Sequence, residues 1–229
     1  MWERFVIPVI TTFGWVPPFA RGFVRDLRPR WAFEEVGQPY EVALITDAKT
    51  PEHRRHQPFG QVPSYRDDIV DIFESGAIVL HIAERAAVAG AGRLIPADGA
   101  ARIRAIQWLT AALNSVEPFV MALAINDIFE ADREWSAARH AKVVEDLDGR
   151  LADLQTALGE RTWLEGEDFD VGDLMMVSVL GGLRGTGVLD RFPALATYVA
   201  RGEERPAHRK AMADHLATFE KPFRTEGSR

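Results

Sequence analysis

The chain has 229 residues, of which 47% are hydrophobic and 27% are charged, so it is long enough for one large globular domain or two modest ones. Its formal net charge is −7 and it contains no block of like charges, which argues against a nucleic-acid-binding surface. Because the chain has no cysteine, disulfides, thiolate metal sites and a cysteine nucleophile are excluded. Any thiol chemistry must therefore use a thiol that belongs to a ligand.

The N-terminal segment is apolar, but it is interrupted by Glu3, Arg4 and Pro8 and has no small-residue cleavage site. It predicts a strand over residues 5–13 rather than a signal peptide. We expect no apolar run to approach the roughly 20 residues that a membrane span needs. The sequence thus predicts a cytoplasmic protein with neither a membrane nor a nucleic acid as partner.

The first part of the chain mixes predicted strands and helices. A loop with Gly14, Pro17 and Pro18 follows the first strand and leads into a helix that stops at Gly37. A buried strand over residues 40–45 comes next, then a hairpin of residues 62–65 and 69–73, and then a helix over residues 74–89. Strands joined through a helix should be parallel and hairpin strands antiparallel, so we expect a mixed sheet with helices packed on it.

The remainder of the chain is predicted to be helical. Gly- and Ala-rich residues 89–99 indicate a linker, with Asp98 as a helix start and Pro118 as a kink in the helix that follows. Asp170 and Asp173 form a capping box, which is a folding device. The predicted fold class is therefore α+β followed by all-α. The predicted domains are residues 1–88, a linker at 89–99, a helical domain at 100–220 and a flexible tail at 221–229.

Two features flank the predicted hairpin. Pro63 stands where a strand begins, a position at which proline costs no ladder bond, unless the Val62–Pro63 peptide is cis and turns the Val62 backbone toward an extended peptide. Glu74 and Ser75 stand at the start of the next helix. Either they are ordinary helix-start residues, or Ser75 binds a ligand carboxylate while Glu74 accepts from a ligand ammonium. The zwitterionic end of an amino acid needs both.

The combination of these features is specific. The segments QPFGQVP (57–63) and ESGAI (74–78) resemble the glutathione transferases, and look most like the bacterial, cytosolic members. The resemblance continues over residues 30–42, 163–176 and 192–207. It implies a thioredoxin-like N-terminal domain with a mixed four-stranded sheet, an all-helical C-terminal domain, glutathione as co-substrate, no metal, and a homodimer.

By position, the resemblance implies that Val62 bonds the cysteinyl backbone of glutathione beside a cis Pro63, and that Glu74 and Ser75 hold the γ-glutamyl end. The candidates for the glycyl carboxylate are Gln61, Lys49, His53 and His56. The two histidines also raise the question of a metal, but they lack a third ligand at matching spacing, so an anion contact or a solvated face is favoured.

The residue that activates the thiol stays unassigned. A thiol with a pKa of about 8.5 is mostly protonated at neutral pH, and the family uses a Tyr, Ser or Cys near the end of the first strand to favour the thiolate. This chain departs from that pattern, because Tyr40 carries the only side-chain hydroxyl in residues 13–45. The catalytic candidates are Trp15, Thr12 and Arg21, beside Thr11, Arg25, Arg28 and backbone N–H groups. The arginines alternatively form a solvated helix face.

An apolar acceptor would meet Phe13, Trp15 and Phe19 of the aromatic loop. Trp108 and Asn114 are predicted to face it from the helical domain, unless they serve packing. The sequence predicts an enzyme that conjugates glutathione to small apolar electrophiles. Two alternatives remain, a glutathione-dependent disulfide reductase or peroxidase and a non-catalytic module that binds glutathione or hydrophobic ligands.

Overall fold

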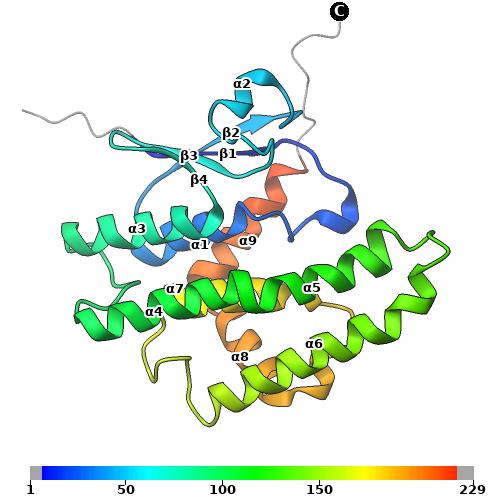
Figure 1. Cartoon of the computed structure of the whole chain (residues 1–229). Coiled ribbons are helices and arrows are strands. Elements are labelled where there is room, and N and C mark those ends of the chain that lie inside the picture. The colour runs from blue at the N-terminus through cyan, green and yellow to red at the C-terminus, as the bar shows by residue number, and fades with distance from the viewer. Residues whose placement is uncertain (1–6, 221–229) are drawn as a thin grey trace, which may run out of the picture. The chain divides into compact units, whose positions relative to one another are not determined.

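The structure is a computed structural model that describes residues 7–220 (Figure 1). The predicted tail and the first residues of the predicted N-terminal strand lie outside this range. The chain forms two compact units. Unit 1 combines the residues up to Leu94 with those from Pro206 onward, and unit 2 spans Ile95–Arg205.

Unit 1 is built on a four-stranded sheet with the order β2-β1-β3-β4. β1 runs parallel to β2 and antiparallel to β3, and β3 and β4 form the predicted hairpin, so the expected mixed sheet is confirmed. Since β2 is an edge strand and none of its five side chains is buried, the expectation of a buried strand at residues 40–45 is wrong. The strands are β1 (Val9–Phe13), β2 (Glu41–Ile45), β3 (Ser64–Arg66) and β4 (Asp71–Phe73).

Helices cover both faces of this sheet: α1 and α3 lie on one face and the short α2 on the other (Figure 1). α1 ends as expected at Gly37, whose φ of 65° is a left-handed value that glycine adopts readily. The helices of this unit are η1 (Pro18–Ala20), α1 (Leu27–Val36), α2 (Pro51–Arg54), α3 (Ser75–Ala89) and α9 (Pro206–Thr218).

The last helix, α9, packs along α1. His208 of α9 meets the buried Trp31 of α1 edge-on, with 4.7 Å between the ring centroids. The helical domain predicted at residues 100–220 thus differs from unit 2 at its C-terminal end. The physical reason is that α9 shares the apolar face of α1, a pairing that no local sequence pattern records.

Unit 2 begins with one long helical run, made of α4 (Gly99–Ala111), η2 (Ala112–Val116), α5 (Glu117–Ala124) and η3 (Ile125–Phe129). Asp98 caps it as predicted, because its Oδ1 accepts from the N–H of Ala101 at 2.9 Å. Pro118 has no N–H, and its ring crowds the carbonyl four residues earlier. The helix passes this point through the wider π-helical turn η2, where a kink was expected.

Because the helix continues through Pro118, the run Gly99–Phe129 is long and apolar enough to cross a membrane. The expectation that no apolar run approaches this length is therefore wrong. Length and composition do not separate a membrane span from a core helix, and α4 packs closely on α7 (Val171–Leu180). A Cβ at Gly172 of α7 would meet the Cβ of Trp108 at 2.7 Å.

The rest of unit 2 is centred on the predicted capping box of α7. The Asp170 side chain accepts from the N–H of Gly172 and of Asp173, and the Asp173 side chain accepts from the N–H of Asp170, so the box is confirmed. Asp173 also accepts from the Tyr198 hydroxyl of α8 at 2.8 Å. The remaining elements are α6 (Ser136–Leu158), α7 (Val171–Leu180), η4 (Gly181–Leu183), η5 (Val188–Arg191) and α8 (Pro193–Glu203).

Candidate functional site

The two features that flank the hairpin meet at one end of it. Ser64 of β3 pairs with Phe73 of β4, so the residue before β3 and the residue after β4 lie side by side. These residues are Pro63 and Glu74. The Val62–Pro63 peptide is cis, as the resemblance implied, and Pro63 lies just outside the strand. The hairpin therefore brings the proline and the acid–hydroxyl pair together.

Glu74 holds an unusual backbone conformation. Its φ of 70° and ψ of 114° make it the one non-glycine residue with a positive φ in residues 7–220. Such a conformation costs about 1–3 kcal/mol and is typical of functional sites. The exposed side chain makes no capping hydrogen bond to α3. The Glu74 carboxylate is thus not used for an ordinary helix start and can accept a hydrogen bond from a ligand.

Ser75, the first residue of α3, is buried and contacts α1. Its Oγ accepts a hydrogen bond from Nη1 of Arg28 at 3.0 Å. The hydroxyl proton of Ser75 can still be donated, and the first N–H groups of α3 have no intrahelical partner. A guanidinium, a hydroxyl and a helix start together suit a carboxylate ligand.

Arg28 is a residue whose place the sequence analysis missed. It was considered only as a positive charge or as part of a solvated helix face, but it is 6% exposed. The solvated-face reading is therefore wrong for Arg28. The available signal was its spacing, since residues three and four positions later, Trp31 and Ala32, lie on the same helical stripe and are fully buried.

The segment before Val62 is fixed by internal hydrogen bonds. Nε2 of His53 lies 2.6 Å from the backbone oxygen of Gln61, and because a carbonyl only accepts, Nε2 carries the proton. The N–H of Gln61 donates to Oε1 of Gln57 at 3.2 Å. His53 is 6% exposed, so it acts on the backbone beside Val62 rather than on a solvated anion.

Lys49 and His56 have partners of their own. Nζ of Lys49 donates to the backbone oxygen of Phe59 at 3.1 Å and keeps two further donors. His56 contacts Asp71 of β4 through a hydrogen bond, with 2.5 Å between Nδ1 and Oδ2. His53 and His56 thus face different acceptors. Within residues 7–220, no group of three or more His, Cys, Asp or Glu residues could hold a metal ion.

The loop after β1 presents aromatic side chains. Trp15 is 60% exposed and Phe19 is 52% exposed. Thr12, in contrast, is fully buried in β1, and its enclosed Oγ1 has no hydrogen-bond partner. This placement argues against Thr12 as the group that contacts a ligand sulfur. Trp15, the half-buried Arg21 and the backbone N–H groups of the loop remain candidates.

Two of the predicted acceptor residues lie in unit 2. The indole Nε1 of Trp108 donates to Oε1 of Glu165 at 2.8 Å, and Nε of Arg104 binds the other carboxylate oxygen at 2.6 Å. The Trp108 N–H is thus used within unit 2, which favours its packing role. Asn114 is exposed in the π-helical turn η2.

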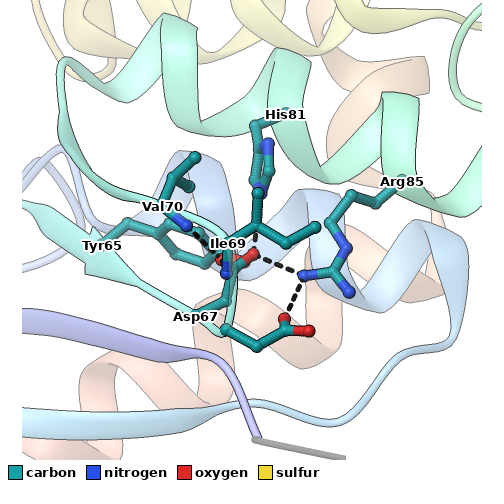
Figure 2. A network of polar contacts seen from close by, with 7 residues as sticks. Tyr65, Asp67, Ile69, Val70, His81 and Arg85 are labelled. Atoms are coloured by element: carbon teal, nitrogen blue, oxygen red, sulfur yellow. Dashed lines mark hydrogen bonds and ion pairs between the residues drawn. The ribbon is translucent and has the colours of Figure 1, made fainter.

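A buried carboxylate, Asp67, fixes the far end of the hairpin to α3 (Figure 2). Its Oδ1 accepts from the N–H groups of Ile69 and Val70, each at 2.8 Å, which closes the turn. Its Oδ2 accepts from three side chains at 2.7–2.8 Å: Tyr65, His81 and Arg85.

Asp67 stays ionised in this network. Burial opposes its ionisation, but hydrogen bonds from His81, from two backbone N–H groups and from Tyr65 hold its pKa well below the usual range. His81 and Arg85 lie on α3, the helix that begins at Ser75. Asp67 therefore holds the hairpin in register with Ser75, a role that the sequence analysis did not predict for this turn residue.

The comparisons with known proteins agree with this geometry. The family described as "Glutathione S-transferase, N-terminal domain" matches residues 10–84. Glutathione S-transferase 1 of Zea mays is 31% identical over 80% of this chain and 88% of its own length. Glutathione S-transferase 4 of the same plant is 27% identical over 89% of this chain and 92% of its own.

A solved structure shows the same fold. A glutathione transferase family member from Pseudomonas fluorescens, with two glutathione molecules bound, aligns with a TM-score of 0.78 at 22% identity, over 90% of this chain and 92% of that one. The thioredoxin-like unit with a mixed sheet, followed by a helical unit, is thus confirmed as the fold class. The chain belongs to the glutathione S-transferase family. The narrower expectation of a bacterial member stays a prediction, because close relatives include maize proteins.

Proposed function

We propose that this protein is a glutathione transferase that conjugates the thiolate of glutathione to small apolar electrophiles. The observation that carries the proposal is the meeting of the cis Val62–Pro63 segment with Glu74 and Ser75 at one end of the hairpin. Family membership supports it, as does the P. fluorescens relative, whose structure contains glutathione.

Each part of the tripeptide finds matching chemistry. The backbone of Val62 pairs with the cysteinyl residue as a short strand would. Glu74 accepts from the γ-glutamyl ammonium, and Ser75 binds the adjacent carboxylate with support from Arg28. The glycyl carboxylate lies near the predicted residues Gln61, Lys49 and His56, of which Lys49 has donors to spare.

The thiol faces the loop after β1 in this proposal. Trp15 donates through its indole N–H, or backbone N–H groups of the loop do so, and Arg21 adds positive charge. The apolar electrophile contacts Phe13, Trp15 and Phe19. Trp108 and Asn114 of unit 2 remain predicted acceptor residues.

Glutathione binding is tested by thermal shift and by retention on immobilised glutathione. Millimolar glutathione should raise the melting temperature, because a ligand that binds the folded state stabilises it. Glu74→Gln should weaken glutathione about tenfold or more through the lost charge-assisted bond. The matched control is Glu145→Gln on α6, an exposed acid, which should bind as the wild type does. Absence of both stabilisation and retention in the wild type would overturn the proposal.

A second function is favoured by one observation: the loop after β1 carries no side-chain hydroxyl or thiol, and the hydroxyl of Thr12 before it is buried. A disulfide reductase or peroxidase that uses two glutathiones needs no protein cysteine, and a non-catalytic binding module needs no thiol activation. Ultraviolet absorbance of bound glutathione at neutral pH distinguishes these cases. A thiolate signal supports conjugation or reduction, which parallel assays with an aryl halide and a small disulfide separate, and an unshifted thiol supports the binding module.

Homodimer formation and a cytoplasmic location also belong to this proposal, since both are what the family resemblance implies. Light scattering coupled to size exclusion tests the first, with a dimer mass expected at micromolar concentration. Cell fractionation tests the second, and a membrane-bound fraction would instead draw attention to the apolar run Gly99–Phe129.

A further inference from the structure

We propose that His215, near the end of α9, is a positioning residue that fixes the loop between β1 and α1. This inference rests on the proposed function in one respect, namely that this loop faces the glutathione thiol. It adds a role for the C-terminal helix that the motifs of the sequence did not indicate. All the residues involved belong to unit 1.

His215 is fully buried and contacts both the loop and the start of α1. Its Nε2 lies 3.2 Å from the backbone nitrogen of Gly22, and its Nδ1 lies 3.3 Å from Oδ2 of Asp26. A backbone N–H can only donate, so Nε2 must be the accepting nitrogen. The proton then sits on Nδ1 and is donated to Asp26, and one neutral tautomer satisfies both contacts.

Asp26 and Arg30 hold the imidazole in this orientation. Asp26 precedes α1 but makes no capping bond to it, and its buried carboxylate instead accepts from Nε of Arg30 at 2.7 Å. Burial opposes ionisation of Asp26, but His215 and Arg30 keep its pKa below the usual value. Nη2 of Arg30 also donates to Oγ1 of Thr218 on α9 at 3.2 Å. The acceptor of the His215 proton is therefore charged and fixed from two helices.

Gly22 is the point of the loop that His215 holds. Its φ of 82° is a backbone conformation that residues other than glycine rarely adopt, and this conformation sets the direction of its N–H. Neighbouring N–H groups bond locally, as Ala20 does to the oxygen of Pro17 and Phe23 to that of Ala20. The Gly22 N–H instead reaches a residue 193 positions later in the chain. Because Gly22 directly follows Arg21 in the loop that carries Trp15, this bond sets where the thiol-facing part of the loop lies.

Two isosteric substitutions separate the positioning bond from the general packing of α9. In His215→Gln the side-chain oxygen reaches the place of Nε2 and can accept from Gly22. In His215→Asn the amide nitrogen takes the place of Nδ1 and can donate to Asp26, but no acceptor reaches Gly22. We expect hydrogen exchange of residues 14–26 to rise about tenfold in the Asn variant, and kcat/KM for glutathione with an aryl halide to fall about fivefold to tenfold, mainly through kcat. The Gln variant should stay within about twofold of wild type in both.

Lys210→Gln provides the control for loosening of α9, since it removes the ion pair of Lys210 with Glu34 of α1 at 3.3 Å and leaves the contacts of His215 intact; its loop exchange should match wild type. Equal loop exchange in the Asn and Gln variants would overturn the proposal. If the Asn variant does not fold, the amide of Gly22 in the wild-type protein decides the question, because exchange as fast as that of an unbonded loop amide contradicts the bond. If the wild type neither binds nor conjugates glutathione, the proposed function fails, and loop exchange still tests the positioning role.

Discussion

Two buried carboxylates, Asp67 in unit 1 and Asp173 in unit 2, have similar hydrogen bonds and opposite pKa shifts. Each side chain is fully buried, accepts from two backbone N–H groups and accepts from a tyrosine hydroxyl at 2.8 Å. Asp67 also contacts His81 and Arg85, whereas Asp173 lies beside a second acid, Asp170. The two sites therefore share their backbone and tyrosine bonds and differ in the charged neighbours, which for Asp67 add two further bonds.

This difference decides the ionisation of each site. Burial raises the pKa of Asp173 to about 7, with a further contribution from the charge of Asp170, and the bonds from Leu164 and Tyr198 only partly offset this. Burial opposes the ionisation of Asp67 as well, but its partners, His81 first, hold its pKa well below the usual range. The hairpin that carries the proposed glutathione site is fixed by a carboxylate that stays charged at neutral pH, and the helical unit is fixed by an acid whose pKa is about 7.

Replacing Asp67 should have the largest effect. Asp67→Ala leaves buried donors without an acceptor, so the free energy of unfolding should fall by about 3–5 kcal/mol. Glutathione affinity should fall with it, because the hairpin loses its attachment to α3. Urea unfolding at neutral pH and glutathione titration measure the two effects. A loss below about 1 kcal/mol would show that the network of Figure 2 does not hold the hairpin.

The second prediction concerns pH. Because the folded pKa of Asp173 is raised from 3.8 to about 7, the folded state binds a proton in this window that the unfolded state has lost. The free energy of unfolding should therefore fall as pH rises across the window, by about 4 kcal/mol in all, and level off above it. Asp67, with its lowered pKa, acts in the opposite direction and loses its contribution only as pH falls below about 4.

Asp173→Asn tests this assignment, since it removes the titrating group. The variant's free energy of unfolding should then depend less on pH between the unfolded and folded pKa values of Asp173. Denaturant unfolding at several pH values, wild type against variant, gives the measurement. Parallel curves for the two proteins would mean that another group is responsible.

A matched pair of tyrosine substitutions should give a smaller and unequal effect. Tyr198→Phe removes the hydroxyl that donates to Asp173 and should cost about 1.5 kcal/mol, while Tyr65→Phe leaves Asp67 with His81 and Arg85 and should cost about 0.5 kcal/mol. The Tyr198 variant should also move the Asp173 titration to higher pH. Equal costs would show that the neighbouring cations do not compensate for a lost hydroxyl.

The smallest effect is expected at Asp68, which pairs with Arg85 at 2.6 Å but is substantially exposed. Asp68→Asn should change the free energy of unfolding by about 0.5 kcal/mol or less, because solvent screens such a pair. The same unfolding measurement at low and high salt checks this. A loss comparable to that of Asp67→Ala would place the important charge on the surface of the turn rather than inside it.

The sequence predicted what is encoded locally. The strands, the Asp98 and Asp170 helix starts and the meeting of Pro63 with Glu74 all follow from short motifs and alternating patterns. The sequence could not predict partners that only the fold brings together, such as Arg28 with Ser75 or Gly22 with His215. A buried polar residue has the same letter as a solvated one, and its burial depends on which distant element covers it. Thr12 shows the same limit: the sequence made it a catalytic candidate, but its side chain is fully buried in the fold.

The placement of α9 has a consequence for how the protein is made. Unit 1 is discontinuous in the chain, because its sheet and α1 leave the ribosome before all of unit 2, and α9 follows only afterward. Unit 2 can fold from consecutive residues. Until α9 is synthesised, Trp31 of α1 cannot form its contact with His208. Distant pairings of this kind slow folding, since a long loop must close before they form. The unit that begins first in the sequence is thus completed last. The fluorescence of Trp31, in a stalled nascent chain whose other five tryptophans are replaced, would report that delay.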